Sequence, residues 1–141
     1  MAETIKGLNI KLGLDTTELD NNLKSITSEL KEQQKDLKAI NNGLKFDPDN
    51  VSLWKDKQEK LNQILETTKK KLETQNARLE EAKKAVEIGA ISEQEFNALK
   101  RSVQYTETDI VKLNEELETT KSKLKSLSSI NVEQLDRKSV V

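Results

Sequence analysis

Residues 19–44 read LDNNLKSITSELKEQQKDLKAINNGL, and the spacing of the apolar residues in this stretch decides the fold class. Leucine or isoleucine recurs at alternating intervals of four and three residues, which places these side chains along one narrow stripe of an α-helix. Only Gln33 interrupts the series. The stripe predicts a long helix over residues 16–45 whose apolar side needs a partner. Its members are Leu19, Leu23, Ile26, Leu30, Leu37, Ile40 and Leu44.

Two further segments repeat this pattern and predict helices over residues 47–88 and 92–129. The second stripe contains Trp54, Gln58, Leu61, Leu65, Thr68, Leu72, Gln75, Leu79, Ala82 and Val86. The third contains Phe96, Leu99, Val103, Thr106, Ile110, Leu113, Leu117, Thr120, Leu124 and Leu127. Hydrophobic residues make up only 33% of the chain and aromatic residues 3%, which suits thin seams between long helices better than a compact core. We therefore predict an all-α fold of long antiparallel helices in coiled-coil or helical-hairpin packing.

Capping residues mark where these helices are expected to start and stop. Asp15 with Glu18, and Ser92 with Glu95, have the spacing of a capping box. In the sequence between the first two helices, Asp47 is placed to cap and Pro48 suits a first helical position, while Phe46 is expected to pack on Val51 as a hydrophobic staple. Gly89 is the expected stop of the second helix. Ile91 and Phe96 form a further expected staple pair.

The two ends of the chain depart from this pattern. In the N-terminal segment 1–15, the sequence IKGLNIKLGL at 5–14 alternates apolar and polar residues, which predicts one short β-strand. Its apolar face consists of Leu8, Ile10, Leu12 and Leu14. Because no second strand follows, we expect the segment to dock by pairing with a strand of another copy or of another protein; packing flat on the bundle and disorder are the alternatives. Residues 130–141 repeat a capping pattern at Asn131, which predicts the start of a truncated fourth helix; the alternative is a frayed tail.

The short breaks between helices favour antiparallel neighbours. Folding about residue 90 places Leu65 near Leu117 and Gln75 opposite Thr106. The rival arrangement is a parallel oligomer of extended, kinked rods. We expect self-association with a trimer as the favoured state, and a monomer or a hexamer as the alternatives. Trp54 is expected to pack in the seam, with an exposed anchor for a partner as the alternative. The residues expected to carry the packing seam and contacts between copies are Leu23, Leu30, Leu37, Trp54, Leu61, Leu65, Leu72, Leu79, Phe96, Leu99, Val103, Ile110, Leu113 and Leu117.

Composition argues against most chemical functions. The chain has no Cys and no His, which removes thiolate chemistry and the commonest general base and metal ligand. Basic and acidic residues number 24 and 25 and are interleaved, so no strong field draws nucleic acid or an anionic membrane. The sequence shows neither a signal-peptide pattern nor an apolar run long enough to span a bilayer. We expect no enzyme activity, no catalytic residue, no metal site and no cofactor.

Four polar clusters have a chemical interpretation beside a structural one. Glu80-Glu81 and Glu115-Glu116 resemble paired carboxylates, but adjacent residues on a helix point in different directions. The run Lys69-Lys70-Lys71 is flanked by glutamates and lacks interleaved aromatic residues, so solvated charge is favoured over phosphate binding. Asp47-Pro48-Asp49-Asn50 resembles the start of a calcium loop, yet it lacks the glycine and the distant glutamate of an EF-hand, which favours helix capping.

The first sixty or so residues resemble the N-terminal region of phage tail tape measure proteins, also called minor tail proteins. The resemblance rests on the entry IKGLNIKLGLDTTELDNNLKSI and on the run SELKEQQKDLKAINNGLKFDPDNVSLWKDKQEKLNQ with its LKFDPDN turn. It implies a structural protein of the virion tail lumen, assembled in the bacterial cytoplasm. Such proteins template the length of the tail tube and contact tail tube, tail terminator or tail assembly chaperone proteins. It also implies a chain that is the front part of something longer. The alternative is a bacterial cytoplasmic coiled-coil adaptor unrelated to phage.

Overall fold

The computed structural model describes the backbone of residues 17–140 and the side chains of residues 17–129. It contains three α-helices: α1 at Thr17–Phe46, α2 at Val51–Glu87 and α3 at Glu93–Val140. The all-α class is therefore confirmed, and residues 17–140 contain no strand. The predicted strand segment 1–15, with Leu8, Ile10, Leu12 and Leu14, lies outside the described residues, as does the Asp15 cap.

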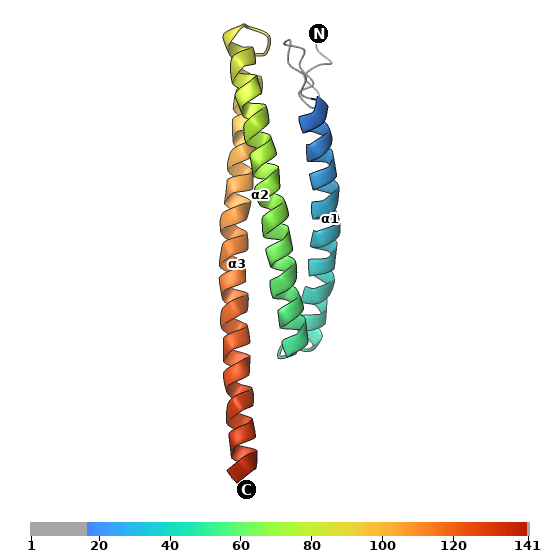
Figure 1. Ribbon diagram of the computed structural model, residues 1–141, viewed down its shortest axis with the longest axis vertical. Coiled ribbons are helices and arrows are strands. Elements are labelled where there is room, and N and C mark those ends of the chain that lie inside the picture. Colours follow the sequence, from blue (N-terminus) through green and yellow to red (C-terminus); the bar gives the residue numbers. More distant parts are fainter. Residues whose placement is uncertain (1–16, 141) are drawn as a thin grey trace.

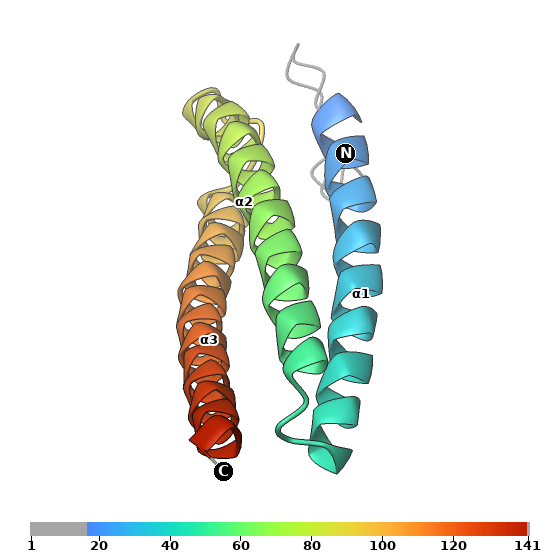
Figure 2. The ribbon, with the colours of Figure 1, turned by 60° about the horizontal axis from the view of Figure 1, so that its bottom comes forward.

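In the view of Figure 1, α1 runs down, α2 runs up and α3 runs down again, and together they make an elongated bundle with α2 between its two neighbours (Figures 1 and 2). Two ion pairs show that α1 and α2 are antiparallel. Asp20 at the start of α1 pairs with Arg78 near the end of α2, with 3.0 Å between carboxylate oxygen and guanidinium nitrogen. Asp36 pairs with Lys60 over 3.3 Å. Both connections are hairpins, so the helices do not form the extended rods of the rival arrangement.

Helices α2 and α3 are held together by apolar side chains at two levels. Leu61, Leu65 and Leu117 form one buried cluster, which confirms that Leu65 lies near Leu117. A second cluster of Ala82, Ala85 and Ile91 lies at the α2–α3 turn, with Phe96 packed against it. Leu61 and Leu65, early in α2, contact Leu117, whereas Ala82, late in α2, lies with Phe96 at the start of α3. The two helices are therefore antiparallel.

The turn between α1 and α2 differs from the expected one, because α2 begins at Val51 instead of residue 47. Asn50 is the N-cap: its side-chain oxygen accepts a hydrogen bond from the Leu53 amide over 3.0 Å. Asp47 instead accepts from the Asn50 side-chain amide over 3.2 Å. Asp47 and Asn50 are both good caps, and the structure uses the later one. The predicted staple is also wrong, since Phe46 is 91% exposed.

The turn between α2 and α3 follows the predicted signals. Gly89 has φ of 74°, in the left-handed region that glycine adopts without steric cost. Its amide donates to the Val86 carbonyl, and the Ala90 amide donates to the Ala85 carbonyl, which is the paired bonding of a Schellman motif. Ser92 and Glu95 form the capping box: the Ser92 amide donates to Glu95 over 3.0 Å, and the Glu95 amide donates to Ser92 over 3.1 Å. Ile91 is buried and Phe96 packs against it, as expected of a staple.

Helix α3 continues without a break from Glu93 to Val140, where the sequence suggests one helix over 92–129 and a fourth helix start within 130–141. The structure has one helix in place of two. A capping residue permits a helix to begin but does not oblige one to end, and no glycine or proline follows Gly89 in the sequence. The cap pattern at Asn131 is therefore insufficient to stop α3.

Candidate functional site

The packing seam is the candidate functional surface, and none of its predicted residues is fully exposed. Five of them are buried: Leu30, Leu61, Leu65, Val103 and Leu117. The other nine are half-buried: Leu23, Leu37, Trp54, Leu72, Leu79, Phe96, Leu99, Ile110 and Leu113. The half-buried residues include much of the α1 stripe, because α1 has a neighbour on one side only. The seam thus packs the helices together and leaves part of its apolar surface near solvent.

Helix α2 carries a second packed face that the heptad reading misses. Ile64 is only 3% exposed, although it lies outside the predicted stripe. This face holds Lys60, Ile64, Thr67 and Arg78, which follow one another at intervals of 4, 3 and 11 residues, each close to a whole number of helical turns. The ion pairs of Lys60 and Arg78 direct this face toward α1. Most of these residues are polar, so they add little to the hydrophobic period. The sequence does hold one signal for this second face: Ile64 and Leu65 are adjacent apolar residues. Adjacent residues of an α-helix point in different directions, so one apolar stripe holds only one of the two.

The ion pair between Asp20 and Arg78 is partly buried, with 17% and 13% of the two side chains exposed. Burial raises the pKa of the Asp20 carboxyl above its ordinary value of 3.8, and the charges of Arg78 and Lys24 oppose this only in part. Burial likewise lowers the pKa of the Arg78 guanidinium, against the effect of Asp20. The cost of removing both charges from water offsets much of their attraction, so an ion pair of this kind contributes little to net stability.

Trp54 lies between two lysines at the end of the bundle that holds the α1–α2 turn. The Lys57 ammonium lies 5.1 Å and the Lys123 ammonium 6.0 Å from the ring centre. Both distances allow a cation–π interaction. The indole nitrogen donates to the Pro48 carbonyl over 2.7 Å. Trp54 is therefore neither an ordinary core residue nor an exposed anchor, and it joins the turn to α2 and α3.

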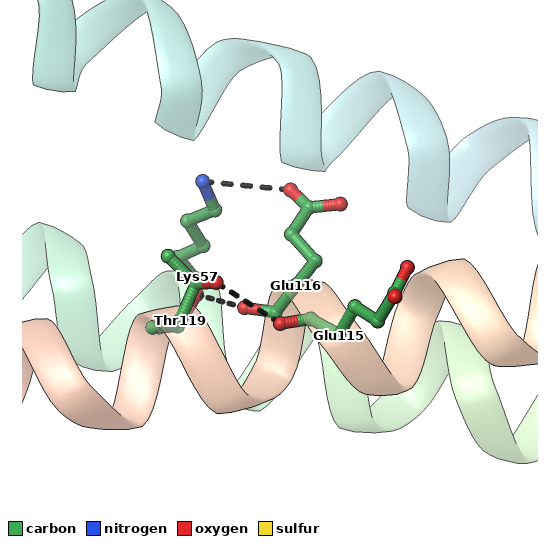
Figure 3. A network of polar contacts seen from close by, with 5 residues as sticks. Lys57, Glu115, Glu116 and Thr119 are labelled. Carbon is green, nitrogen blue, oxygen red and sulfur yellow. Dashed lines mark hydrogen bonds and ion pairs between the residues drawn. The ribbon is translucent and has the colours of Figure 1, made fainter.

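The two lysines are also paired with carboxylates. Lys123 contacts Asp49 over 3.3 Å, which ties the turn to α3. Lys57 contacts Glu116 over 3.5 Å, between α2 and α3. Figure 3 shows these two side chains reaching toward each other beside the ribbon of α1, while Glu115 points away. Glu115 and Glu116 thus have separate surroundings and do not form a carboxylate pair.

Threonines occupy several of the most buried positions. Thr106 is 1% exposed and Thr120 is fully enclosed. Each donates its hydroxyl to the carbonyl four residues earlier, Thr106 to Ser102 and Thr120 to Glu116. The hydroxyls are satisfied within their own helix, so they cost little when buried. The opposition of Gln75 and Thr106 stays a prediction. The side-chain oxygen of Gln75 is buried and has no hydrogen-bond partner among the described residues.

Shallow grooves run between the helices and are lined mainly by polar side chains. One lies between α1 and α2 and includes Glu29, Gln33, Gln63 and Thr67. Another lies over α2 between α1 and α3 and includes Leu30, Ile64 and Leu113. Within residues 17–129, no group of three or more acidic side chains is arranged to hold a metal ion. In the part of the chain that the structure describes, no helix is apolar over a length sufficient to cross a membrane.

No protein-family model, no curated protein and no solved structure matches this chain.

Proposed function

We propose that the chain is a structural assembly segment: the N-terminal coiled-coil region of a phage tail tape measure protein, which templates the length and assembly of the tail tube. The observation that carries this proposal is the LKFDPDN turn at residues 44–50, the most specific part of the resemblance. Pro48 accepts the Trp54 indole, Asp49 meets Lys123 and Asn50 caps α2. The motif thus has a physical purpose as the junction of two long helices.

The shape and chemistry of the bundle support a structural function over catalysis. Helices of 30, 37 and 48 residues pack through thin seams into an elongated bundle. A long bundle of this kind holds its two ends at a fixed separation, which suits a structural protein. The groove between α1 and α2 has a mixed polar lining, in which Glu29, Glu59 and Glu66 lie beside Lys55. We propose no enzymatic activity and no cofactor. The site of action in this proposal is the tail lumen, reached during assembly in the bacterial cytoplasm.

We also propose that the α2–α3 pair packs as a coiled coil, with knobs into holes. Leu61 is fully enclosed and forms one buried cluster with Leu65 and Leu117 across the two helices, which suits leucine knobs that enter holes of the facing helix. The half-buried stripe of α1 gives copies of the chain a lateral surface for self-association, and we propose a trimer ahead of a monomer or a hexamer. A cytoplasmic coiled-coil adaptor is the alternative function, since its helices would use the same seam.

Co-purification with purified tail proteins tests the proposed function. The full chain is presented in turn to tail tube, tail terminator and tail assembly chaperone proteins from a phage whose tail genes adjoin this one. At least one is expected to bind. Leu117→Asp disrupts the seam and is expected to abolish capture, whereas the exposed Lys70→Ala is expected to retain it. Failure of all three tail proteins to bind the folded chain would favour the adaptor.

A further inference from the structure

Helix α1 is held to the bundle by less apolar packing than α3 is. The structure describes all of α1, and of its 30 residues only Leu30 and Leu44 are buried. The two buried apolar clusters lie between α2 and α3 and at the turn that joins them, and α1 contributes the half-buried Leu37 to the edge of one. Because burial of apolar surface is the main favourable term in folding, the α1–α2 interface is the weaker of the two.

Polar contacts across the α1–α2 interface add little stability to it. Two ion pairs cross it, Asp20 with Arg78 and Asp36 with Lys60. Burial raises the pKa of Asp20 although Arg78 is beside it, so the carboxylate loses more by leaving water than it gains from its partner. The Asp36 side chain is 57% exposed, and an exposed pair contributes little. The buried side-chain oxygen of Gln33 has no hydrogen-bond partner among the described residues, which costs further stability.

The α1–α2 turn fixes one end of α1. Leu44 is buried beside this turn, and Gly43 lies so close to Leu53 that a Cβ on the glycine would stand 3.0 Å from the leucine Cδ1 atom. The Lys123 ammonium pairs with Asp49 and ties the turn to α3. From the turn, α1 and α2 diverge toward the start of α1, as both views show (Figures 1 and 2). Helix α1 is therefore anchored at its C-terminal end and splayed from α2 at its N-terminal end.

From this arrangement we propose that α1 is a hinged arm, which swings away from α2 as one unit about the α1–α2 turn while α2 and α3 stay packed. Native proteins open in cooperative units whose free energies range from near zero up to that of global unfolding, and α1 is the unit of lowest free energy in this bundle. Opening uncovers Leu30 on α1 and Ile64 on α2, which line one groove and are buried in the closed bundle. The hinged arm is independent of whether the chain belongs to a phage tail.

Hydrogen exchange of the full, dilute chain, followed by mass spectrometry of its peptides, tests the hinged arm. Exchange is measured in the regime where it reports the population of open molecules. Amides of residues 24–36 in α1 should exchange at least about tenfold faster than those of residues 60–72 in α2 and 110–122 in α3. These three ranges lie at one level of the bundle and away from the helix ends, so fraying does not account for a difference. Equal protection of the three ranges would overturn the proposal.

Two substitutions distinguish opening of the arm from unfolding of the whole bundle. Ile91→Val removes one methylene group from a cluster whose members all lie in α2, α3 and the turn between them. That cluster stays packed when the arm is open, so exchange should rise about two- to tenfold in α2 and α3 and stay unchanged in α1. Leu30→Ala weakens the closed bundle against the open and the unfolded form alike, so exchange should rise in all three helices.

The exposed Lys70→Ala is the control, and it should leave exchange unchanged in every helix. The response of α1 to Ile91→Val decides the question. If this substitution raised exchange in α1 by the same factor as in α2 and α3, the three helices would unfold only together, and the hinged arm would be wrong.

Discussion

At the scale of single residues, the seam leucines differ in how completely they are enclosed. Leu61 is fully buried and Leu117 is 4% exposed, whereas Leu72 and Leu113 are half-buried. The cost of truncating a leucine grows with the cavity that remains. Leu61→Ala or Leu117→Ala should therefore destabilise the fold by about 2–4 kcal/mol, and Leu72→Ala by less. Urea unfolding followed by circular dichroism measures the difference.

Lys70→Ala is the exposed control on the same helix and should change the free energy of unfolding by less than about 0.5 kcal/mol. If all four substitutions shifted the unfolding midpoint equally, the assignment of buried and half-buried seam positions would be wrong.

Asp20 makes the stability depend on pH in a direction opposite to that of an ordinary paired carboxylate. Its pKa is raised from 3.8 in the folded state by burial, so the folded chain holds this proton more tightly than the unfolded chain does. Asp20 therefore contributes most favourably below pH 3.8, and this contribution is lost as the pH rises through the raised pKa. Asp20→Asn removes this titration. As the pH rises from 3 to neutral, the variant should therefore become more stable relative to the wild type.

Urea unfolding of both proteins at several pH values in that range tests the direction. Arg78→Gln supplies a matched comparison, because it removes the positive charge that opposes the increase in the Asp20 pKa. In this variant the contribution of Asp20 to stability should depend more steeply on pH. A difference between wild type and Asp20→Asn that stayed constant with pH would contradict the burial argument.

At the scale of elements, two glycines beside helix ends are predicted to respond in opposite ways. Gly89 has a left-handed backbone with open space around it, so Gly89→Ala should cost about 1 kcal/mol or more through strain alone. Gly43 lies within α1, where alanine is favoured by up to about 1 kcal/mol. A Cβ there would meet the Leu53 Cδ1 atom at 3.0 Å, and the flexible end of that side chain is able to shift.

Thermal melts of the two variants give the comparison directly. Gly89→Ala is expected to lower the melting temperature, and Gly43→Ala is expected to leave it unchanged or raise it. A similar loss in both would show that the contact with Leu53 outweighs helix propensity, and a neutral Gly89→Ala would show that the α2–α3 turn relaxes to another conformation.

The helices themselves are largely predictable from the sequence, because an apolar period of alternating three and four residues survives even in a highly charged chain. The α2–α3 turn is predictable too, since Gly89, Ser92 and Glu95 each suit one backbone position. The start of α2 is not predictable in this way, because Asp47 and Asn50 are equally good caps in the sequence. The choice between them goes with tertiary contacts of the turn, such as the hydrogen bond from the Trp54 indole to the Pro48 carbonyl. The α1-facing side of α2 is missed for another reason: Lys60, Thr67 and Arg78 pack there as polar residues.

At the scale of the whole molecule, the hairpins make a bundle of intermediate length. The 48 residues of α3 span about 72 Å, which gives a radius of gyration on the order of 20 Å. A compact globule of this chain length would have about 14 Å. The three helices laid end to end would reach about 170 Å and a radius near 50 Å. Small-angle X-ray scattering extrapolated to low concentration is expected to give the intermediate value, and either extreme would contradict the hairpin arrangement.

An odd number of antiparallel helices has a mechanical consequence. Since α1 begins at one end of the bundle and α3 finishes at the other, tension applied between these two points acts along the helix axes (Figure 1). Both interfaces of α2 are then loaded in shear, with all their side-chain contacts strained together instead of being peeled apart one turn at a time. Such a bundle should resist stretching up to a threshold force and then yield abruptly. Beyond that force the hairpins would open, and the three helices would line up end to end in a rod more than twice as long as the bundle.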